Sequence, residues 1–322
     1  MRIVLAIALP FIFQAFLKGQ EIQLLLNGTR PDSSFYQIEK IGANEFWIGG
    51  EYGILKKVDT LGNVSSLGLP NLGKDIIKIK KVDSFVYLLT ADAVIYRYDL
   101  VQKSFLTKSF TGFKNKCFYD FVARQDGTLV VCGGATGIAE GKPKIPRGFI
   151  ATVSPDLSEI KIVWKSLRKF VWALLEEEDQ SILAVTFNGL NTKVMKSEDL
   201  KSWSKVARIK GLVHEINLID DKIWFSGARS ALFKKSGILG TIRDTFKKIK
   251  GTGCIWRLDK INDRIVGVTY SGDLIHIGTE GNVIGRFDIP KYYSLYDLEQ
   301  MTASKMLVVG RGKTAFIVPL ER

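Results

Sequence analysis

The chain is poor in the residues that usually build metal centres and disulfide frameworks. Its 322 residues include three cysteines, Cys117, Cys132 and Cys254, and two histidines, His214 and His276. Three cysteines are too few for a disulfide scaffold, so we expect buried free thiols. Neither histidine has a cysteine or carboxylate at metal-ligand spacing, and no nucleophile elbow, phosphate loop or paired-cysteine motif occurs. The sequence therefore predicts no metal site and no cofactor.

Long apolar runs are also missing, except at the N-terminus. Arg2 is followed by an apolar run from Ile3 to about Phe16, which is typical of an export signal and too short for a spanning helix with normal flanks. The segment from Ala15 to Gln20 has no clean pair of small residues for cleavage, so a retained membrane anchor stays open as an alternative. We expect residues 1–20 to be a signal peptide and the mature protein to be secreted or periplasmic, with no membrane span.

Acidic residues are fewer than basic ones, and the formal net charge is +13. The excess is spread over single lysines and short pairs such as Lys80-Lys81 and Lys247-Lys248. Scattered lysines keep proteins soluble and prevent exposed strand edges from pairing with other chains. A basic surface can also bind an anionic partner. Both interpretations stay open, but the export signal argues against a nucleic-acid partner.

One sequence pattern recurs along almost the whole chain. Leu212 to Lys235 predicts three short strands, with a tight turn at Asp220-Asp221 and a polar loop around Arg229. Similar phrases return about every forty residues, which is the spacing of propeller blades. Their second strands begin near seven positions: Phe46, Val86, Leu129, Ile182, Ile223, Ile265 and Met306.

Seven copies predict an all-β fold, a seven-bladed β-propeller of four-stranded antiparallel blades formed by residues 21–322. Blade three carries an insertion from Gly133 to Gly148 between its second and third strands. Blade seven has three strands before the chain stops at Arg322. We expect Glu21 to Asn27 to supply its outer strand and so close the ring, since a closed ring leaves no free edge.

Aligning the predicted first strands gives one column that is rich in rings. In blade order it contains Tyr36, Ile77, Tyr119, Trp172, His214, Trp256 and Tyr296, each followed by a polar or small residue. First strands lie innermost in a propeller, so these side chains should gather at the mouth of the central channel. Large rings can simply fill space between blades near the axis. They can also form an aromatic floor that stacks sugars or grips peptide side chains.

Loops on the same face are expected to add arginines. Arg147, Arg229 and Arg311 come from three different blades. Guanidinium groups bind carboxylates and phosphates through paired hydrogen bonds, so the three arginines would suit an anionic ligand.

The segment Ser197-Glu198-Asp199-Leu200-Lys201-Ser202-Trp203 resembles an Asp-box, the Ser-x-Asp-x-Gly-x-x-Trp turn of sialidase-like propellers, with Lys201 in place of the glycine. The resemblance implies a structural turn away from any active site. The repeat as a whole resembles exported propellers of the photosystem II stability factor type, the BNR repeat group and the WD40/YVTN-like group. That resemblance implies an assembly or binding protein.

The sequence thus predicts a monomeric, non-catalytic protein that binds a protein, a peptide or a cell-envelope glycan at its channel mouth. The alternative is a sialidase-like glycan hydrolase or lyase that uses the same face. The sialidase resemblance would then assign Arg147, Arg229 and Arg311 to the substrate carboxylate, and Tyr296 or Tyr119 beside Glu215 or Asp120 to the chemistry. The order Ile145-Pro146-Arg147 differs from the Arg-Ile-Pro signature of that family.

Overall fold

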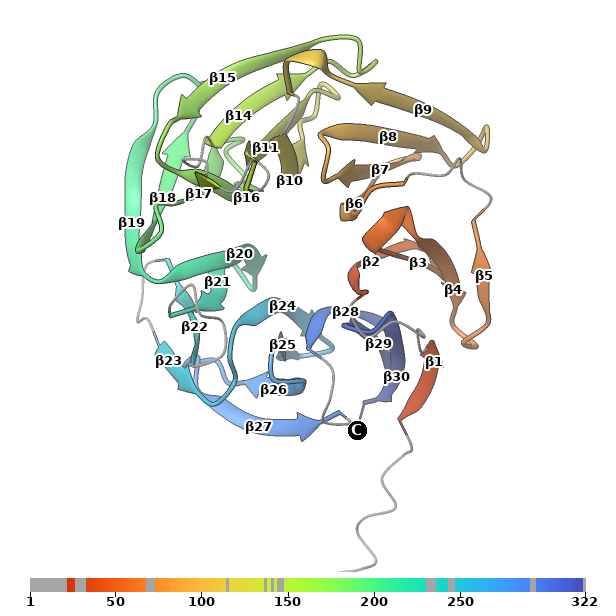
Figure 1. Cartoon of the computed structure of the whole chain (residues 1–322). Helices are drawn as coiled ribbons and strands as arrows, with labels where there is room; N and C mark the ends of the chain where they lie inside the picture. Colours follow the sequence, from red (N-terminus) through yellow and green to blue (C-terminus); the bar gives the residue numbers. More distant parts are fainter. Residues whose placement is uncertain are drawn as a thin grey trace, which may run out of the picture.

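Seven four-stranded antiparallel sheets stand around a central channel in the computed structural model (Figure 1). The predicted all-β, seven-bladed propeller is confirmed. The structure describes residues 22–26, 33–67, 73–113, 116–135, 138–139, 142–143, 148–229, 236–242, 247–289 and 294–320. Within these ranges no helix is long and apolar enough to cross a bilayer.

Each blade runs outward from an inner strand beside the channel to an outer strand at the rim. The inner strands are β2 (Phe35–Gly42), β6 (Ile76–Val82), β10 (Lys116–Ala123), β16 (Phe170–Glu176), β20 (Leu212–Ile219), β24 (Ile255–Ile261) and β28 (Leu295–Thr302). The second strands are β3 (Glu45–Gly50), β7 (Phe85–Thr90), β11 (Leu129–Ala135), β17 (Ile182–Phe187), β21 (Lys222–Ala228), β25 (Arg264–Thr269) and β29 (Lys305–Gly310). The third strands are β4 (Leu55–Asp59), β8 (Val94–Asp99), β14 (Gly148–Val153), β18 (Asn191–Ser197), β22 (Ser236–Thr241), β26 (Asp273–Ile277) and β30 (Thr314–Pro319). The outer strands are β5 (Val64–Ser66), β9 (Ser104–Ser109), β15 (Ile160–Ser166), β19 (Ser204–Lys210), β23 (Lys247–Lys250), β27 (Val283–Asp288) and, in blade seven, β1 (Gln23–Leu26).

The two ends of the propeller meet in blade seven. Strand β1 pairs antiparallel with β30, with Gln23 opposite Ile317 (Figure 1). The predicted closing strand is therefore present, over Gln23–Leu26 within the expected segment. The predicted signal peptide, residues 1–20, lies outside the described residues.

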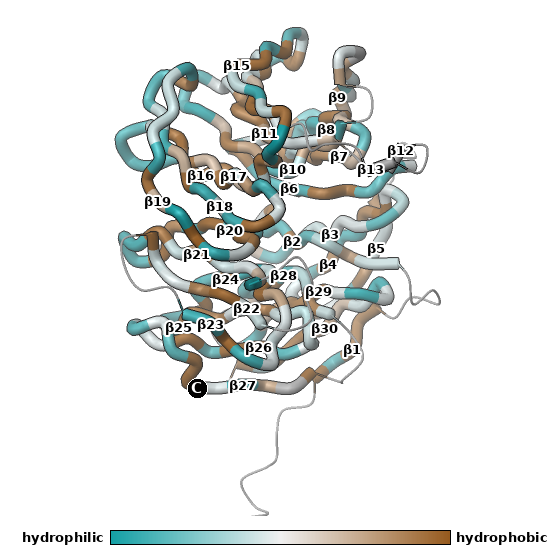
Figure 2. The backbone as a smooth tube through the Cα atoms, turned by 60° about the vertical axis from the view of Figure 1, so that its left-hand side comes forward, coloured by the Kyte–Doolittle hydropathy of each residue, from teal (hydrophilic) through white to brown (hydrophobic). Residues whose placement is uncertain are grey.

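The apolar cores lie between neighbouring blades. The second strands are the most deeply buried, and every residue of β17 is buried. Phe46 and Ile48 of blade one pack against Leu307 and Val309 of blade seven, which is one of seven such clusters. Figure 2 shows apolar and polar stretches alternating along the chain, as expected when each sheet must bury its faces against its neighbours. All three cysteines are buried free thiols, as predicted.

Blade three carries the predicted insertion between its second and third strands, but the insertion begins later than expected. Gly133 and Gly134 belong to β11 and do not open the loop. Within the insertion, β12 (Ile138–Ala139) pairs with β13 (Lys142–Pro143) as a short hairpin. The sequence misplaced the boundary because glycine usually marks a turn. Here Gly133 permits close backbone packing, since a Cβ atom would lie 1.9 Å from the Cys117 carbonyl oxygen.

Candidate functional site

All seven inner strands carry a register shift at the same place, a β-bulge or equivalent irregularity. The residues at the shift, each skipped in the pairing with the second strand, are Tyr36, Ile77, Tyr119, Trp172, His214, Trp256 and Tyr296. A regular strand sends successive side chains to opposite faces, whereas a bulge inserts one extra residue. As a result, Tyr119 and the adjacent Asp120 both line the channel, and so do Trp256 and Arg257.

The skipped residues form a ring that we call the collar: Tyr36, Ile77, Tyr119, Trp172, His214, Trp256 and Tyr296. Its aromatic members contact one another in blade order. Ring centroids are 4.5 Å apart for Tyr119 and Trp172, 5.3 Å for Trp172 and His214, and 4.1 Å for His214 and Trp256. The series continues at 5.4 Å from Trp256 to Tyr296 and at 5.6 Å from Tyr296 to Tyr36. Six rings from six blades therefore form one continuous arc.

The collar is uncharged and only half-buried. Burial lowers the pKa of His214 to about 3, so its imidazole is neutral at ordinary pH. Burial and a hydrogen bond that the Tyr36 hydroxyl donates to Glu51 Oε1 (2.6 Å) raise the pKa of Tyr36 well above its usual value. The collar thus offers neutral ring surface to the channel.

The collar surrounds a cavity of about 340 Å³. The predicted gathering of Tyr36, Tyr119, Trp172, His214, Trp256 and Tyr296 at the channel matches the cavity lining. Arg229 and Arg311 are exposed and are absent from the cavity lining, but the charge of Arg311 acts on the collar residue Tyr296 and opposes the rise of its pKa. Arg147 lies outside the described residues. A site built from these three arginines therefore stays a prediction.

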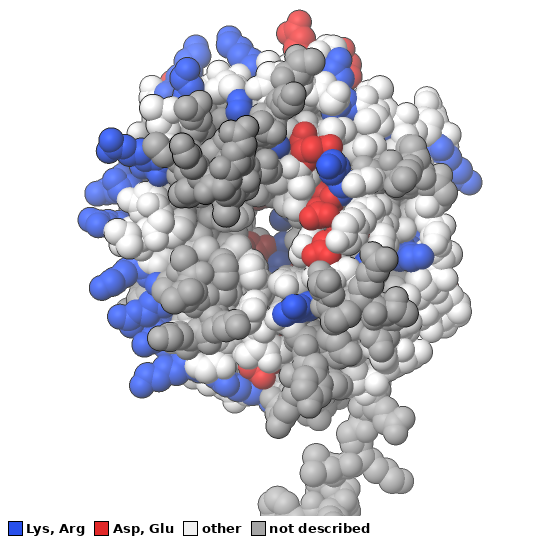
Figure 3. Space-filling model, viewed as in Figure 1, with Lys and Arg blue, Asp and Glu red and all other residues white. Residues whose placement is uncertain are grey.

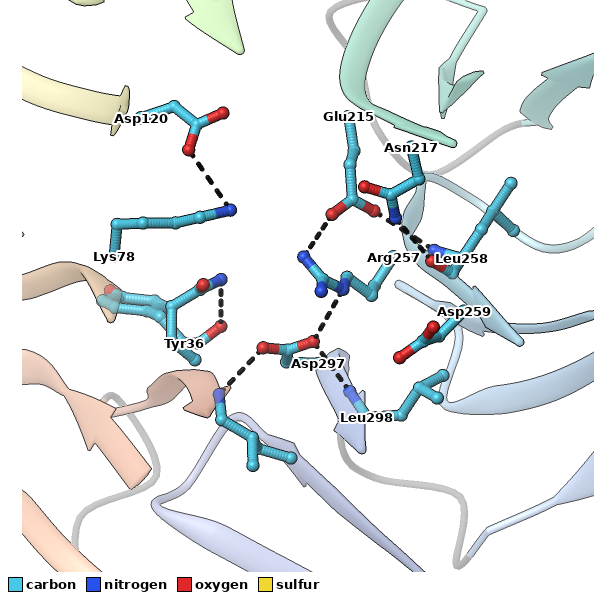
Figure 4. Close-up of polar contacts among 12 residues, drawn as sticks. Tyr36, Lys78, Asp120, Glu215, Asn217, Arg257, Leu258, Asp259, Asp297 and Leu298 are labelled. Atoms are coloured by element: carbon cyan, nitrogen blue, oxygen red, sulfur yellow. Dashed lines mark hydrogen bonds and ion pairs between the residues drawn. The ribbon is translucent and has the colours of Figure 1, made fainter. Parts of the chain in front are cut away.

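Below the collar lies a second ring, which we call the belt. It consists of the residues that follow the collar residues: Gln37, Lys78, Asp120, Ala173, Glu215, Arg257 and Asp297. Figure 4 shows the charged side chains of the belt, Lys78, Asp120, Glu215, Arg257 and Asp297, reaching into the channel. Arg257 pairs with Glu215 and, through Nε, with Asp297 Oδ1 at 3.3 Å. On the opposite side, Lys78 Nζ lies 3.4 Å from Asp120 Oδ1.

The carboxylates of the belt also join neighbouring blades. Asp120 Oδ2 accepts a hydrogen bond from the main-chain N–H of Leu174 in the next blade (2.9 Å). Glu215 Oε2 accepts one from Leu258 (3.2 Å), and Asp297 Oδ2 accepts one from Ile38 (2.8 Å). These bonds satisfy N–H groups at the inner edges of the sheets, so the belt helps to hold the ring together.

A third ring, the lower ring, faces the opposite end of the channel. Its members follow the belt by two positions: Glu39, Lys80, Val122, Leu175, Asn217, Asp259 and Glu299. Several of them line a cavity of about 580 Å³ that shares Lys78, Asp120, Glu215 and Arg257 with the collar cavity. Burial, together with Asp259 and Asp297, raises the pKa of Glu299 to about 8.

The three rings contain more acids than bases. They hold three basic side chains, Lys78, Lys80 and Arg257, and six acidic ones, Glu39, Asp120, Glu215, Asp259, Asp297 and Glu299, of which Glu299 is mostly protonated at pH 7. Burial raises the pKa of Glu215 to about 7 in spite of Arg257. The channel is therefore acidic within a chain whose net charge is +13. Within the described residues no group of histidine, cysteine or acidic side chains could hold a metal ion.

The Asp-box-like segment forms a structural turn between β18 and β19. Asp199 Oδ1 accepts hydrogen bonds from the main-chain N–H groups of Lys201 (2.8 Å) and Ser202 (2.7 Å). These bonds hold the pKa of Asp199 at about 2. A second turn of this kind, which the sequence did not reveal, lies around Asp156, whose Oδ1 accepts from Ser158 N (3.0 Å). Its segment, Ser-Pro-Asp-Leu-Ser, lacks both the glycine and the tryptophan of the motif.

Comparison with known proteins places the chain in a fold but not in a family. No protein-family model and no curated protein match the sequence. Among solved structures, a streptogramin B lyase has a TM-score of 0.68 at 10% identity, over 93% of this chain and 98% of that one. YCF48 bound to D1 peptide has a TM-score of 0.66 at 10% identity, over 95% and 97% of the two chains. The WD40 propeller domain of Doa1 has a TM-score of 0.65 at 11% identity, over 94% and 97%.

The protein is therefore a seven-bladed β-propeller whose neighbours have different functions. At 10% or 11% identity these neighbours share the fold with this chain. Function has to be argued from the chain's own residues, because propellers of one architecture bind many different ligands.

Proposed function

We propose that this protein is exported and that it binds a segment of another protein in the collar cavity, without chemical turnover. The arc of six half-buried rings around about 340 Å³ is the observation that carries this proposal. Rings that serve only as packing are usually covered, whereas these rings keep exposed area at a concave site. Large rings also give contact area at a small cost in side-chain entropy.

A protein or peptide partner is favoured over a cell-envelope glycan. The belt directly below the rings presents charged side chains, and side chains or main-chain groups of a peptide can pair with them. A neighbour in fold, YCF48, has been solved with D1 peptide bound. A glycan partner is the other outcome that the following experiment separates.

The double variant Trp172→Ala/Trp256→Ala is expected to lose the partner while keeping the fold. Immobilised wild-type protein would be exposed to an extracytoplasmic extract, and the retained protein would be identified and then tested in purified form. A matched control is Trp164→Ala/Trp203→Ala, because both of its tryptophans are half-buried and lie outside the channel. Retention by both double variants would contradict the collar as the binding site. Retention of glycans but no protein would contradict a protein partner.

Export predicts a shortened N-terminus. Mass spectrometry of the protein recovered from its own cell envelope or medium is expected to find a chain that begins near Glu21. A chain recovered in the envelope with residues 1–20 intact would support the retained anchor instead.

A further inference from the structure

The charges of the belt alternate in sign from blade to blade, except at blades one and four, whose residues are neutral. In blade order the belt runs from Lys78 to Asp120, Ala173, Glu215, Arg257 and Asp297, and neutral Gln37 completes the ring. Blade four contributes the methyl group of Ala173, which lines the same cavity as Asp120 and Glu215 of blades three and five. Figure 4 shows these two carboxylates on opposite sides of the channel. If the signs alternated here too, the residue between Asp120 and Glu215 would be a cation. Ala173 carries no charge.

The ion-pair partners of the two carboxylates beside this position lie on the far sides. Asp120 pairs with Lys78 of blade two, and Glu215 pairs with Arg257 of blade six. Each carboxylate uses its other oxygen for one main-chain N–H, from Leu174 or Leu258. The N–H of Leu174 belongs to blade four, so Asp120 already contacts that blade. A carboxylate has about four lone-pair sites, so both groups can accept further hydrogen bonds.

Trp172 of the collar belongs to the same blade and lies above this position. Its ring contacts Tyr119 at 4.5 Å and His214 at 5.3 Å, so three rings from blades three to five cover the space. Ring faces attract cations, and the attraction grows as the cation loses water.

The distribution of charge over the whole molecule agrees with a cationic ligand. Figure 3 shows many lysines and arginines projecting from the outer edge of the ring, while most of the acidic groups on this face lie beside the channel opening, together with a few basic ones. Glu51 accepts the hydrogen bond of the collar residue Tyr36. An anion at the level of the belt would have to draw Lys78 away from Asp120, or Arg257 away from Glu215 and Asp297.

We propose that the slot below Trp172, between Asp120 and Glu215, binds the cationic side chain of a lysine or an arginine from the partner protein. This inference rests on the proposed function and adds the chemistry of the group that enters the cavity. The stem of that side chain stacks on Trp172 and Tyr119, and its head donates hydrogen bonds to both carboxylates. Its charge offsets part of the carboxylate excess of the channel.

Capped tripeptides that differ in one side chain test the charge preference. The purified protein, labelled with ¹⁵N, would be titrated with acetyl-Gly-Arg-Gly-amide, with its lysine counterpart and with its citrulline counterpart. The indole signal of Trp172, assigned from a Trp172→Phe variant, reports on the slot. The arginine and lysine peptides are expected to shift this signal saturably, and citrulline to bind about tenfold more weakly, since charge-assisted hydrogen bonds are the stronger ones.

Equal affinity for the arginine and citrulline peptides, tighter binding of a glutamate peptide, or no shift with arginine would each overturn the inference. None of these results bears on whether a partner is retained by the wild type and lost from the tryptophan double variant. Failure of the charge preference and failure of the proposed function are therefore separate outcomes.

A second test needs no ligand. Ala173→Lys places an ammonium group in the slot, and Ala173→Met places a chain of similar length without charge. The lysine variant is expected to melt about 2–4 °C above the methionine variant at neutral pH. This difference should shrink near pH 4, where Glu215 is protonated. A lysine variant that melts at or below the methionine variant would show that the slot does not favour a cation.

Discussion

Replacing Arg257 with methionine is expected to lower the free energy of unfolding by about 3–5 kcal/mol, because it leaves buried carboxylates without their cation. Arg257 is the partner of both Glu215 and Asp297. Asp297 is 1% exposed, so water cannot replace the guanidinium. Urea denaturation followed by tryptophan fluorescence would measure the loss.

The pH dependence of this loss follows from the carboxylates. Burial raises the pKa of Asp297, and it raises that of Glu215 from 4.5 to about 7. A carboxyl group with a raised pKa in the folded protein contributes most below its unfolded pKa, and this contribution is lost as the pH rises through the folded value. Without Arg257 the folded pKa values rise further. The gap between variant and wild type should therefore be small near pH 4 and should widen up to about pH 7 and beyond.

Lys78→Met is the matched control for the loss of a belt cation. Lys78 makes one ion pair, at 3.4 Å, and Asp120 keeps its hydrogen bond from Leu174 when the lysine is removed. Its expected loss is smaller than that of Arg257→Met. Equal losses, or a loss below about 1 kcal/mol for Arg257→Met, would mean that the carboxylates find other donors.

Gly227→Ala is expected to cost about 3 kcal/mol of folding free energy, since a buried backbone has to shift to accept the new atom. Gly227 pairs with Val213, the residue directly before the register shift at His214. An added Cβ atom would lie 2.0 Å from the carbonyl oxygen of Leu212. Because the strain falls beside His214, we also expect the indole signals of the neighbouring Trp172 and Trp256 to move.

Gly112→Ala is the corresponding control, because a Cβ atom there meets nothing within 4 Å. Its effect on stability should stay within about 0.5 kcal/mol. Thermal unfolding of both variants beside the wild type is the measurement. Similar melting temperatures for the two variants would show that the backbone of blade five adapts to the added methyl group.

The blades and the collar were predictable because they rest on local signals. Short turns such as Asp220-Asp221 and alternating apolar residues specify each hairpin, and the repeat then specifies the ring. Once the first strands were aligned, Trp172 and Trp256 fell at the same place in their blades, and equivalent positions of a propeller face the same channel.

The residues of the belt could be recognised in the sequence as a column of polar or small residues. The sequence did not show that their side chains point into the channel. Strict alternation would turn Asp120 away from the channel that Tyr119 faces. The skipped pairing at Tyr119 appears only when β10 is paired with β11, so the joint orientation of the two residues is a property of the sheet. The three predicted arginines are a different case. Arg229 and Arg311 do not line the collar cavity and Arg147 lies outside the described residues, so a common site for them stays a prediction.

The sequence by itself determined the number of blades, their strand order and the residues of the collar, because each depends on short-range pairing repeated at a regular interval. The tertiary structure decided which charged side chains of the belt form ion pairs. Arg257 reaches carboxylates of blades five and seven, and Asp120 and Glu215 flank a position without charge. Such contacts join residues from different blades, and their geometry exists only after the ring has closed.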